Sequence, residues 1–387
     1  MKLPKLPFET PPDREDGSSS WVHLGLILSG RMGQISPFVL LPLWVLFVVA
    51  ACWPWNAWRV AAALISAGFL LADWTMLALL PRAQRSWGPV MPPLLGLTLL
   101  RVGLSWLCAW LLPYLPALAI LNGVIAAMAF YATWIEPFWV KVTPMRHTWP
   151  QWNSPPLRIL HLSDIHFERY SPREQAVLEH MRRLQPDLIL VTGDYLNLSS
   201  VHDPQAHEDV RRFLEQLQAP LGVYAITGSP VVDVKGIVPE IFDGLPIHWL
   251  RDEVAEVHHN GNTLWLIGVS CTYREERDIA AITSLLETLP AGATNTLLLY
   301  HTPDLMPAVA ELGVSLYLCG HTHGGQLRLP LFGAMATSSR WGKRYEKGLY
   351  HEKQTTLYVH CGLGMEGLGA PRARFLARPE VVVWEFS

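Results

Sequence analysis

Four long apolar runs follow one another in the first third of the chain. They cover residues 36–55, 57–80, 90–112 and 115–136, with only short connectors between them. A helix needs about 20 apolar residues, each rising about 1.5 Å, to cross the roughly 30 Å of hydrocarbon in a bilayer. Each run reaches or approaches that length, and several end in tryptophan, which is typical of the aromatic belt at a membrane–water boundary. We therefore expect four transmembrane helices within residues 36–140, rather than a buried helical bundle of a soluble protein.

The composition agrees with a chain of two unlike parts. Half of the 387 residues are hydrophobic and 16% are charged, whereas a soluble domain has close to a quarter charged residues. The apolar excess ends near residue 140. The formal net charge of −3 leaves no electrostatic footprint for nucleic acid, so we expect no such partner. The five cysteines form no C-x-x-C pair, which argues against a disulfide framework or a zinc ribbon.

The basic residues near the apolar runs predict an orientation. They cluster in the N-terminal tail, in the loop between the second and third runs, and after the fourth: Lys2, Lys5, Arg14, Arg31, Arg82, Arg85, Lys141 and Arg146. Cytoplasmic loops are enriched in lysine and arginine. We therefore expect a multi-pass protein of the inner (cytoplasmic) membrane, with both ends in the cytoplasm. Residues 1–35, rich in proline, serine and charge, are expected to form a disordered, juxtamembrane tail.

Two opposite charges fall inside the apolar runs. Asp73 and Arg101 each lie some distance from the loop that joins the second and third runs, and at about 1.5 Å per residue both are about 10–14 Å deep. An unpaired charge in hydrocarbon costs several kcal/mol. We therefore predict that the two side chains pair across a helical hairpin.

Beyond an expected linker at 141–156, the pattern changes to short apolar runs separated by amphipathic stretches, over residues 157–387. The runs predict buried strands at 158–162, 188–191, 222–226, 263–268, 296–300 and 315–318. The stretches predict helices at 171–184, 207–217 and 275–289, the first with Ser171 as its N-cap and Pro172 at its first position. Asn260-Gly261 indicates a hairpin turn. Alternating strands and helices indicate an α/β fold.

Carboxylate and imidazole side chains follow several of these strands. They are Asp164, His166, Asp194, His301, His321 and His323. Loops at the carboxyl ends of strands are where α/β sheets place their ligand sites. Mixed carboxylate and imidazole ligands favour Mn, Fe, Zn or Co over Ca or Mg. Two such ions about 3.5–4 Å apart can clamp a phosphoryl group, and Asp194 is placed to bridge them.

One segment is more specific than the others. A single Asp-x-His or a single histidine after a strand is often structural, but residues 320–326 read Gly-His-Thr-His-Gly-Gly-Gln. Two histidines flanked by three glycines contribute little packing, so a ligand role explains them better. The motifs also occur in a fixed order, Asp-x-His, Gly-Asp, His and Gly-His-x-His.

In that order the motifs resemble the calcineurin-like metallophosphoesterase superfamily. The Gly-His-Thr-His-Gly-Gly-Gln form, the glycine-rich segment 362–369 and Arg378-Pro379-Glu380 look like its membrane-associated bacterial branch. The resemblance covers residues 157–387. It implies an α/β sandwich of two packed sheets flanked by helices, two divalent metal ions, and hydrolysis of phosphoester or pyrophosphate bonds.

The resemblance also implies ligands for each ion. Asp164, His166, Asp194 and His323 would hold one ion, and Asp194, His301 and His321 the other, together with the asparagine of a Gly-Asn-His motif. Here this sequence departs from the family, because the segment after the third strand reads Thr227-Gly228-Ser229-Pro230. Ser229 replaces the asparagine and Pro230 replaces the catalytic histidine. Asp194 and Ser229 are therefore the candidate catalytic residues, with Ser229 a weak, neutral replacement.

The substrate expected from this combination is amphiphilic. A membrane-held domain favours a membrane lipid or a lipid-linked phosphate, and family members that act on UDP-2,3-diacylglucosamine make a lipid-linked nucleotide diphosphate attractive. A late basic set could hold anionic groups, and its Arg340 and Arg344 are candidate substrate ligands, an ordinary solvated face being the alternative. The alternative function is a metal-binding membrane scaffold or sensor that lost turnover with the Gly-Asn-His motif. The oligomeric state stays open.

Overall fold

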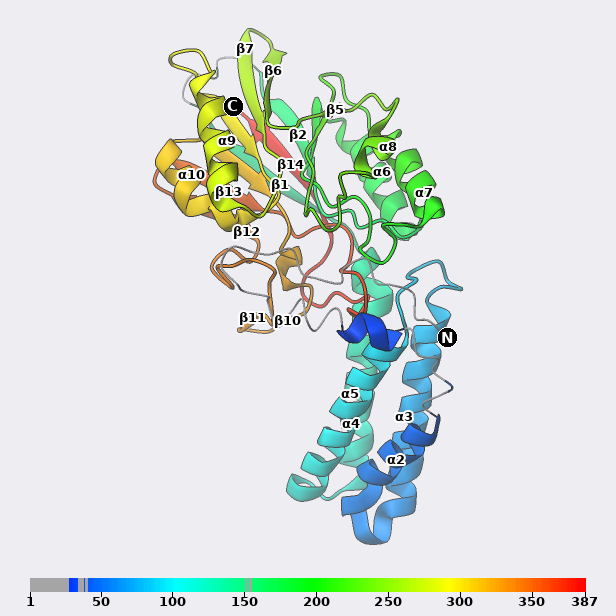
Figure 1. Ribbon diagram of the computed structural model, residues 1–387. Helices are drawn as coiled ribbons and strands as arrows, with labels where there is room; N and C mark the ends of the chain where they lie inside the picture. Colours follow the sequence, from blue (N-terminus) through cyan, green and yellow to red (C-terminus); the bar gives the residue numbers. More distant parts are fainter. Residues whose placement is uncertain (1–27, 34–37, 39–40, 150–151, 153–154) are drawn as a thin grey trace. The chain divides into compact units, whose positions relative to one another are not determined.

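The computed structural model in Figure 1 describes residues 28–33, 38, 41–149, 152 and 155–387. The tail expected at 1–35 therefore lies almost entirely outside the described residues. The described chain divides into two compact units. A helical unit contains the residues up to Glu136 together with Glu366–Ala373, and an α/β unit contains Pro137–Met365 and Arg374–Ser387.

The helical unit consists of antiparallel helices, with a longer loop between α3 and α4 than between the others. They are α2 (Leu41–Cys52), α3 (Arg59–Leu79), α4 (Met91–Leu111) and α5 (Leu115–Phe130). A tight 3₁₀ turn at Trp53–Trp58 joins α2 to α3, with Asn56 at φ 44°. After α5 the chain continues through a π-helical turn at Tyr131–Ile135 and a 3₁₀ turn at Glu136–Phe138.

The prediction of four spanning helices is wrong: the described residues contain three helical stretches long and apolar enough to cross a membrane. These are Pro42–Leu79, Met91–Leu111 and Leu115–Phe138. The first stretch takes in α2, the turn and α3. The apolar run 36–55 does not become a separate span, because the turn begins at Trp53 and leaves α2 only 12 residues long. At about 1.5 Å per residue that is roughly 18 Å, short of the roughly 30 Å needed. The three long helices indicate a membrane anchor.

The helical unit buries polar residues among apolar ones and is apolar outside. Its buried faces carry small and polar residues such as Ser66, Thr98 and Ser105, while leucine, valine and tryptophan side chains are exposed along the outer faces. In a bilayer the outward-facing side chains contact hydrocarbon, so apolar residues are favoured there. The helices associate through small side chains and through hydrogen bonds between polar ones. This distribution fits a hydrocarbon surrounding.

The predicted pair of charges is confirmed. The guanidinium of Arg101 on α4 donates to both carboxylate oxygens of Asp73 on α3, at 2.6 and 2.7 Å. Its remaining nitrogen donates at 2.9 Å to the backbone and side-chain oxygens of Asn122 on α5. Both charged side chains are buried, so one polar cluster joins three helices.

The α/β unit is built on two six-stranded sheets of mixed direction. The first has the order β1-β14-β2-β3-β4-β5 and the second β12-β13-β9-β8-β7-β6. The first sheet's strands are β1 (Lys141–His147), β14 (Glu380–Phe386), β2 (Leu157–Leu162), β3 (Leu188–Val191), β4 (Val223–Ala225) and β5 (His248–Trp249). The second sheet's strands are β12 (Gly348–Glu352), β13 (Thr355–Val359), β9 (Leu316–Cys319), β8 (Thr296–Leu299), β7 (Asn262–Gly268) and β6 (Glu253–His259). A small hairpin, β10 (Arg328–Leu329) and β11 (Gly333–Ala334), stands apart from both.

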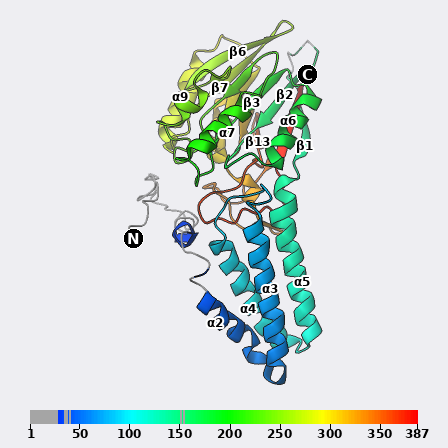
Figure 2. The same cartoon turned by 90° about the vertical axis from the view of Figure 1, so that its right-hand side faces the viewer.

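The two sheets pack face to face with helices on each outer side (Figures 1 and 2). Alternation along β2 shows how the layers form: Leu157 and Ile159 join the apolar core between the sheets, and Leu160 and Leu162 face the helices. Over the first sheet lie α6 (Pro172–Leu184), α7 (Pro204–Leu214) and α8 (Val238–Phe242). Over the second lie α9 (Glu275–Glu287) and α10 (Met306–Leu312). The α/β fold with two sheets flanked by helices is confirmed.

Most expected elements of this unit are present. Ser171 caps α6 in a reciprocal capping box with Glu174, which satisfies two free amides at the helix start. Asn260 and Gly261 turn the β6–β7 hairpin with positive φ at both residues. The segment expected as a linker at 141–156 differs, because it begins with β1, a strand of the first sheet paired in parallel with β14. An apolar-poor edge strand gives no sequence pattern of its own, so it was missed.

Candidate metal centre

Two groups of ligand-type side chains are buried where strands of both sheets end. Asp164, His166 and His323 form one group, and Asp194, His301 and His321 form the other, with ligand atoms in each group within 4.8 Å of one another. Asp164 and His166 follow β2, Asp194 follows β3, His301 follows β8, and the two remaining histidines follow β9. All six positions lie just past the carboxyl end of a parallel strand, where the strand order of an α/β sheet opens a crevice.

Asp194 faces both groups. Its Oδ2 lies 3.2 Å from Nε2 of His301 in its own group and 3.5 Å from Nε2 of His166 in the other. Nε2 of His166 in turn lies 3.0 Å from Nε2 of His323. One carboxylate oxygen directed at two clusters of ligands is the arrangement that a bridging ligand between two metal ions requires.

The backbone at these positions is strained. Five of the six residues have positive φ, namely Asp164, His166, Asp194, His321 and His323. Residues other than glycine rarely adopt this conformation, and where they do the strain tends to accompany function. Close approach of the loops adds to the constraint, since a Cβ on Gly320 would collide with the side chains of Asp164 and Ser163. The glycine of the Gly-His-Thr-His motif is therefore needed to let β9 and β2 end beside each other.

Burial and mutual charge set the protonation of the site. Burial lowers the pKa of His166 to about 4 and raises the pKa of Asp164 to about 6. Burial also opposes ionisation of Asp194, but His301 and its neighbours outweigh that effect and lower the pKa of this carboxyl. Metal ligation requires neutral imidazole and ionised carboxylate, and the neutral His166 and ionised Asp194 are already in that form.

Backbone groups orient the ligands from behind. Nδ1 of His301 lies 2.8 Å from the carbonyl oxygen of Thr192. Burial opposes the charge on His301, but the Asp194 carboxylate outweighs it and raises the pKa of this imidazole to about 10. A metal ion would therefore displace the Nε2 proton while Nδ1 keeps its proton toward the carbonyl, which is the usual support of a metal-ligating histidine. The amide of His321 donates to Oδ1 of Asp164 at 2.8 Å.

Ser229 lies in the second group. Its backbone amide donates to Oδ1 of Asp194 at 2.6 Å, and its hydroxyl lies 3.2 Å from Asp194 Oδ2 and 3.2 Å from His301 Nε2. The hydroxyl is also 3.4 Å from Nδ1 of His321. The loop after β4 thus still directs a side-chain oxygen at the second group, although serine is shorter than asparagine and offers a hydroxyl in place of an amide oxygen.

Asp233 supports the loops rather than the groups themselves. Its Oδ2 accepts from the amides of Asp194 at 2.8 Å and Gly228 at 2.6 Å, and its Oδ1 accepts from Tyr195 at 3.0 Å. Burial and the nearby Asp194 charge raise the pKa of Asp233 to about 7. Both oxygens are occupied by backbone amides, so this carboxylate holds two site loops together.

Arg374 also belongs to the site, although no sequence motif marks it. Its fully buried guanidinium donates to the carbonyl oxygens of Gly364, Cys361 and Ala377, and lies 3.4 Å from Nδ1 of His323. It fastens the glycine-rich loop after β13 behind the first group. An arginine in a loop carries no sequence signal of burial, and only its closeness to the glycine-rich segment could have drawn notice.

The basic residues proposed as substrate ligands are engaged elsewhere. Arg340 pairs with Glu275, and its amide donates to Asp304 at 3.2 Å. Arg344 pairs with Glu352 at 2.6 Å and lies over the rings of Trp341 and Tyr345. These contacts hold neither arginine against the ligand residues of the metal centre.

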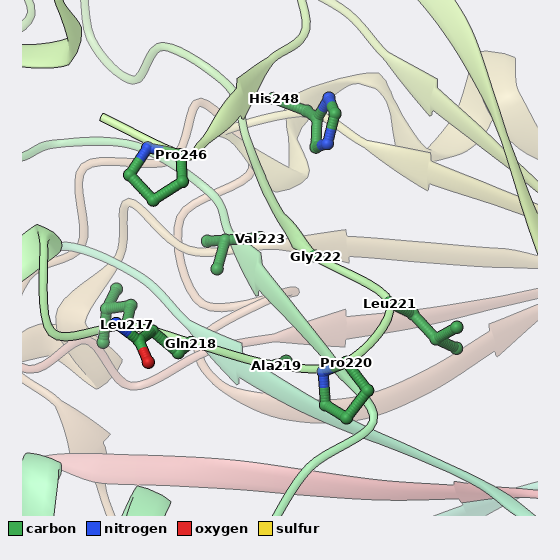
Figure 3. Close-up of a pocket in the computed structure, with 9 residues that line it drawn as sticks. All are labelled: Leu217, Gln218, Ala219, Pro220, Leu221, Gly222, Val223, Pro246 and His248. Atoms are coloured by element: carbon green, nitrogen blue, oxygen red, sulfur yellow. The ribbon is translucent and has the colours of Figure 1, made fainter. Parts of the chain in front are cut away.

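A surface hollow of about 560 Å³ lies at another part of the first sheet (Figure 3). It is lined by residues 217–223 with Pro246 and His248. These residues precede or begin β4 and β5, so the hollow is at the amino ends of the strands, whereas the ligand groups follow the carboxyl ends. None of the six ligand-type residues lines it.

The donor atoms fit a pair of divalent transition metals. Oδ2 of Asp164 and Nδ1 of His166 are buried without a hydrogen-bond partner in the described structure, and such atoms are costly unless something binds them. The donor set is oxygen and imidazole nitrogen without thiolate, which suits Mn, Fe, Zn or Co. The two buried groups are consistent with a dinuclear metal site.

Such a site at the meeting edge of two packed sheets defines a metal-dependent hydrolase. Comparison with known proteins gives the family: the model of the calcineurin-like phosphoesterases matches residues 157–325. The metallophosphoesterase YkuE of Bacillus subtilis (strain 168), itself uncharacterized, is 32% identical over an alignment of 270 residues that covers 66% of this chain and 88% of YkuE. The chain therefore belongs to the calcineurin-like metallophosphoesterases and is a hydrolase of that type.

Two further relatives carry named activities. Phosphodiesterase YaeI of Escherichia coli (strain K12) is 28% identical over 262 residues, covering 66% of this chain and 91% of YaeI. UDP-2,3-diacylglucosamine pyrophosphatase LpxG of Chlamydia trachomatis (serovar D) is 26% identical over 331 residues, covering 68% of this chain and 95% of LpxG.

Proposed function

We propose that this protein is a membrane-anchored, metal-dependent hydrolase of a pyrophosphate or activated phosphodiester bond in a lipid-linked substrate. The observation that carries the proposal is the shared orientation of Asp194 Oδ2 toward both ligand groups, in a chain that also has three helices able to cross a membrane. A soluble substrate would not require the anchor, whereas an amphiphilic one is held in the bilayer.

The ligand roles follow from the two groups. Asp164, His166 and His323 would hold one ion and His301 and His321 the other, with Asp194 between them. Two bound ions would supply positive charge to the phosphoryl oxygens. The chain's own residues hold the site in shape: Thr192 keeps the proton of His301 on Nδ1, and Asp233 ties the loops that carry Asp194 and Ser229.

The loop after β4 supports the choice of bond. Pro230 has no proton to give, at the position where the family has a histidine that assists the leaving group. An alkoxide needs such a proton most, because it is a strongly basic leaving group. Protonation by a general acid accelerates such a step by about 10²–10⁴-fold. A nucleotide or phosphate is far less basic and departs more readily unprotonated. The similarity to LpxG, named for a UDP-2,3-diacylglucosamine pyrophosphatase activity, supports a lipid-linked nucleotide diphosphate as the substrate class.

The proposal is tested on the full-length protein in detergent micelles with Mn²⁺. Metal content and turnover of UDP-diacylglucosamine and of a p-nitrophenyl phosphodiester are measured for the wild type, Asp194→Ala and His301→Ala. Because Asp194 faces both groups, we expect Asp194→Ala to lose more bound metal than His301→Ala, and both to lose turnover.

A matched control is Asp209→Ala, which removes a buried aspartate of α7 that pairs with Arg212, outside both groups. It should keep its metal. Equal metal content in the wild type and in Asp194→Ala would contradict the hypothesis that Asp194 bridges two metal ions. Full metal loading without turnover of either substrate would instead favour a metal-binding scaffold over an enzyme.

A further inference from the structure

The hairpin of β10 and β11 exposes an unusual number of large apolar side chains. Residues 328–335, here called the apolar hairpin, present Leu329, Leu331, Phe332 and Met335 to solvent, with exposed fractions from 45% upward and Leu331 fully exposed. Leu331 is at the turn with φ 66°, so the turn holds its side chain outward at a conformational cost. A contiguous apolar projection of this kind on a folded domain marks a surface that something covers.

The hairpin is rooted in the candidate metal centre. It begins five residues after His323, and Nη1 of Arg328 donates to the carbonyl oxygen of Gly324 at 2.7 Å. In Figure 1 its label stands at the opposite end of the α/β unit from the turn between β6 and β7.

The base of the hairpin is also tied to the chain that leaves the last long apolar helix. The amide of Arg328 donates to the carbonyl of Phe375 at 3.0 Å. Three residues further on, Arg378 donates to the carbonyl of Trp139 at 3.0 Å, and its guanidinium lies 3.9 Å from the centre of that ring. Trp139 directly follows the apolar stretch Leu115–Phe138. Three residues span at most about 11 Å, so the hairpin starts close to the point where the chain leaves the apolar stretch.

The surroundings of the hairpin are basic. Five basic residues and one acidic residue lie between positions 328 and 347. Three of the basic residues, Arg328, Arg340 and Arg344, pair with glutamates, which leaves the lysines as the positive charges nearest the hairpin. Lys343 lies 3.4 Å from the centre of the Phe332 ring and donates to that residue's carbonyl. Apolar side chains beside basic ones are the pattern of segments that lie in the interface of an anionic membrane. An exposed tryptophan beside an arginine, as at Trp139 and Arg378, is typical of the same depth.

From these observations we propose that the apolar hairpin inserts into the headgroup and upper acyl region of the bilayer that holds the helices. Its apolar side chains enter the lipid, and Lys343 beside Phe332 faces anionic headgroups. The hairpin then holds the metal centre over the membrane surface, where a lipid-linked phosphate can reach it. This adds a docking surface to the proposed function, but insertion itself requires only the anchor and not the substrate.

The test measures lipid contact directly. In the full-length protein, Cys52 is changed to serine, since the other four native cysteines are buried. A polarity-sensitive fluorophore is then attached to Leu331→Cys, in nanodiscs of phosphatidylethanolamine and phosphatidylglycerol. We expect emission at shorter wavelength than in the matched control Asn260→Cys, at the exposed β6–β7 turn, and quenching by brominated lipid at position 331 alone.

The outcomes separate lipid from other occupants. Water-like emission at 331, unquenched as at 260, would overturn the proposal. A shift to shorter wavelength without quenching by brominated lipid would overturn it too, because a protein surface, such as a second copy of the chain, would then cover the hairpin. Leu331 has no packing to lose, so the substitution leaves the fold intact, and because no turnover is measured, a wrong substrate class does not affect the result.

Discussion

At the scale of single residues, the loop after β4 decides what chemistry the site can perform. Ser229 keeps a hydroxyl among Asp194, His301 and His321, but its oxygen is on a shorter side chain than an asparagine amide. Pro230 removes a proton donor altogether. Both changes reduce stabilisation of a basic leaving group, and neither disturbs the other ligands, whose positions depend on different strands.

Restoring the family residues should therefore change substrate preference. We expect Ser229→Asn with Pro230→His to raise the turnover of an alkyl phosphodiester, by up to the 10²–10⁴-fold that a general acid supplies. Turnover of a p-nitrophenyl diester should rise less, by the gain that the repaired ligand alone gives, because its leaving group needs no proton. Steady-state rates with Mn²⁺ measure both.

Each single change serves as the control for the other. Ser229→Asn alone repairs a ligand and should raise both substrates together, whereas Pro230→His alone supplies the acid. If the double variant gains equally on alkyl and aryl substrates, proton donation is not what the loop lacks.

At the scale of elements, a buried ion pair holds the helical unit. Asp73 of α3 and Arg101 of α4 meet in two hydrogen bonds, and Asn122 of α5 takes the remaining guanidinium nitrogen. Removing one partner of a buried pair leaves a charge without compensation, which costs about 3–5 kcal/mol. The pair thus fixes which faces of three helices meet.

We expect Asp73→Ala and Arg101→Ala each to destabilise the protein by about that amount, in unfolding measured in detergent micelles. Exchanging the two residues should cost less than either alanine substitution, because the pair is kept, although Asn122 then loses its cation. Arg82→Ala, at an exposed arginine of the α3–α4 loop, should have almost no effect. Losses that simply add in the double alanine variant would show that the two side chains act independently.

At the scale of the whole molecule, the α/β unit is closed by a strand from its beginning and one from its end. Glu380 at the start of β14 is buried and accepts from Thr143 at 2.7 Å and from Lys141 at 2.8 Å, both on β1. Burial opposes ionisation of Glu380, but His360 and Lys141 outweigh it and lower the pKa of this carboxyl to about 2. β1 is therefore an integral strand, although the family model begins only at residue 157.

A truncated protein that begins at Leu157 should consequently be less stable than one that begins at Pro137. It leaves Glu380 buried without its lysine, which costs about 3–5 kcal/mol, and it exposes an edge of β14. Thermal unfolding of the two soluble proteins measures the difference. Glu380→Gln should destabilise the longer protein and partly rescue the shorter one; equal stability of the two would show that β1 contributes nothing.

Patterns local in the chain were sufficient for much of this molecule. The apolar runs indicated membrane helices, alternation indicated the strands, and Asn260-Gly261 and Ser171 marked a turn and a cap. Each of these patterns involves residues that are close together in the chain, so their spacing can be read from the sequence itself. The pairing of Asp73 with Arg101 was also accessible, because helix geometry converts residue number into depth.

What the sequence determined by itself is the kind of protein: an apolar helical segment followed by an α/β unit whose strands end in metal-ligand residues. Tertiary structure alone decided the count of three long helices, since the turn at Trp53 depends on packing as well as on Pro54. It alone recruited β1 into a sheet through a partner strand 237 residues away, and it buried Arg374 behind His323. The physical reason is the same in each case: these features rest on contacts between residues distant in the chain, and their stabilisation exists only once the sheets and helices have come together.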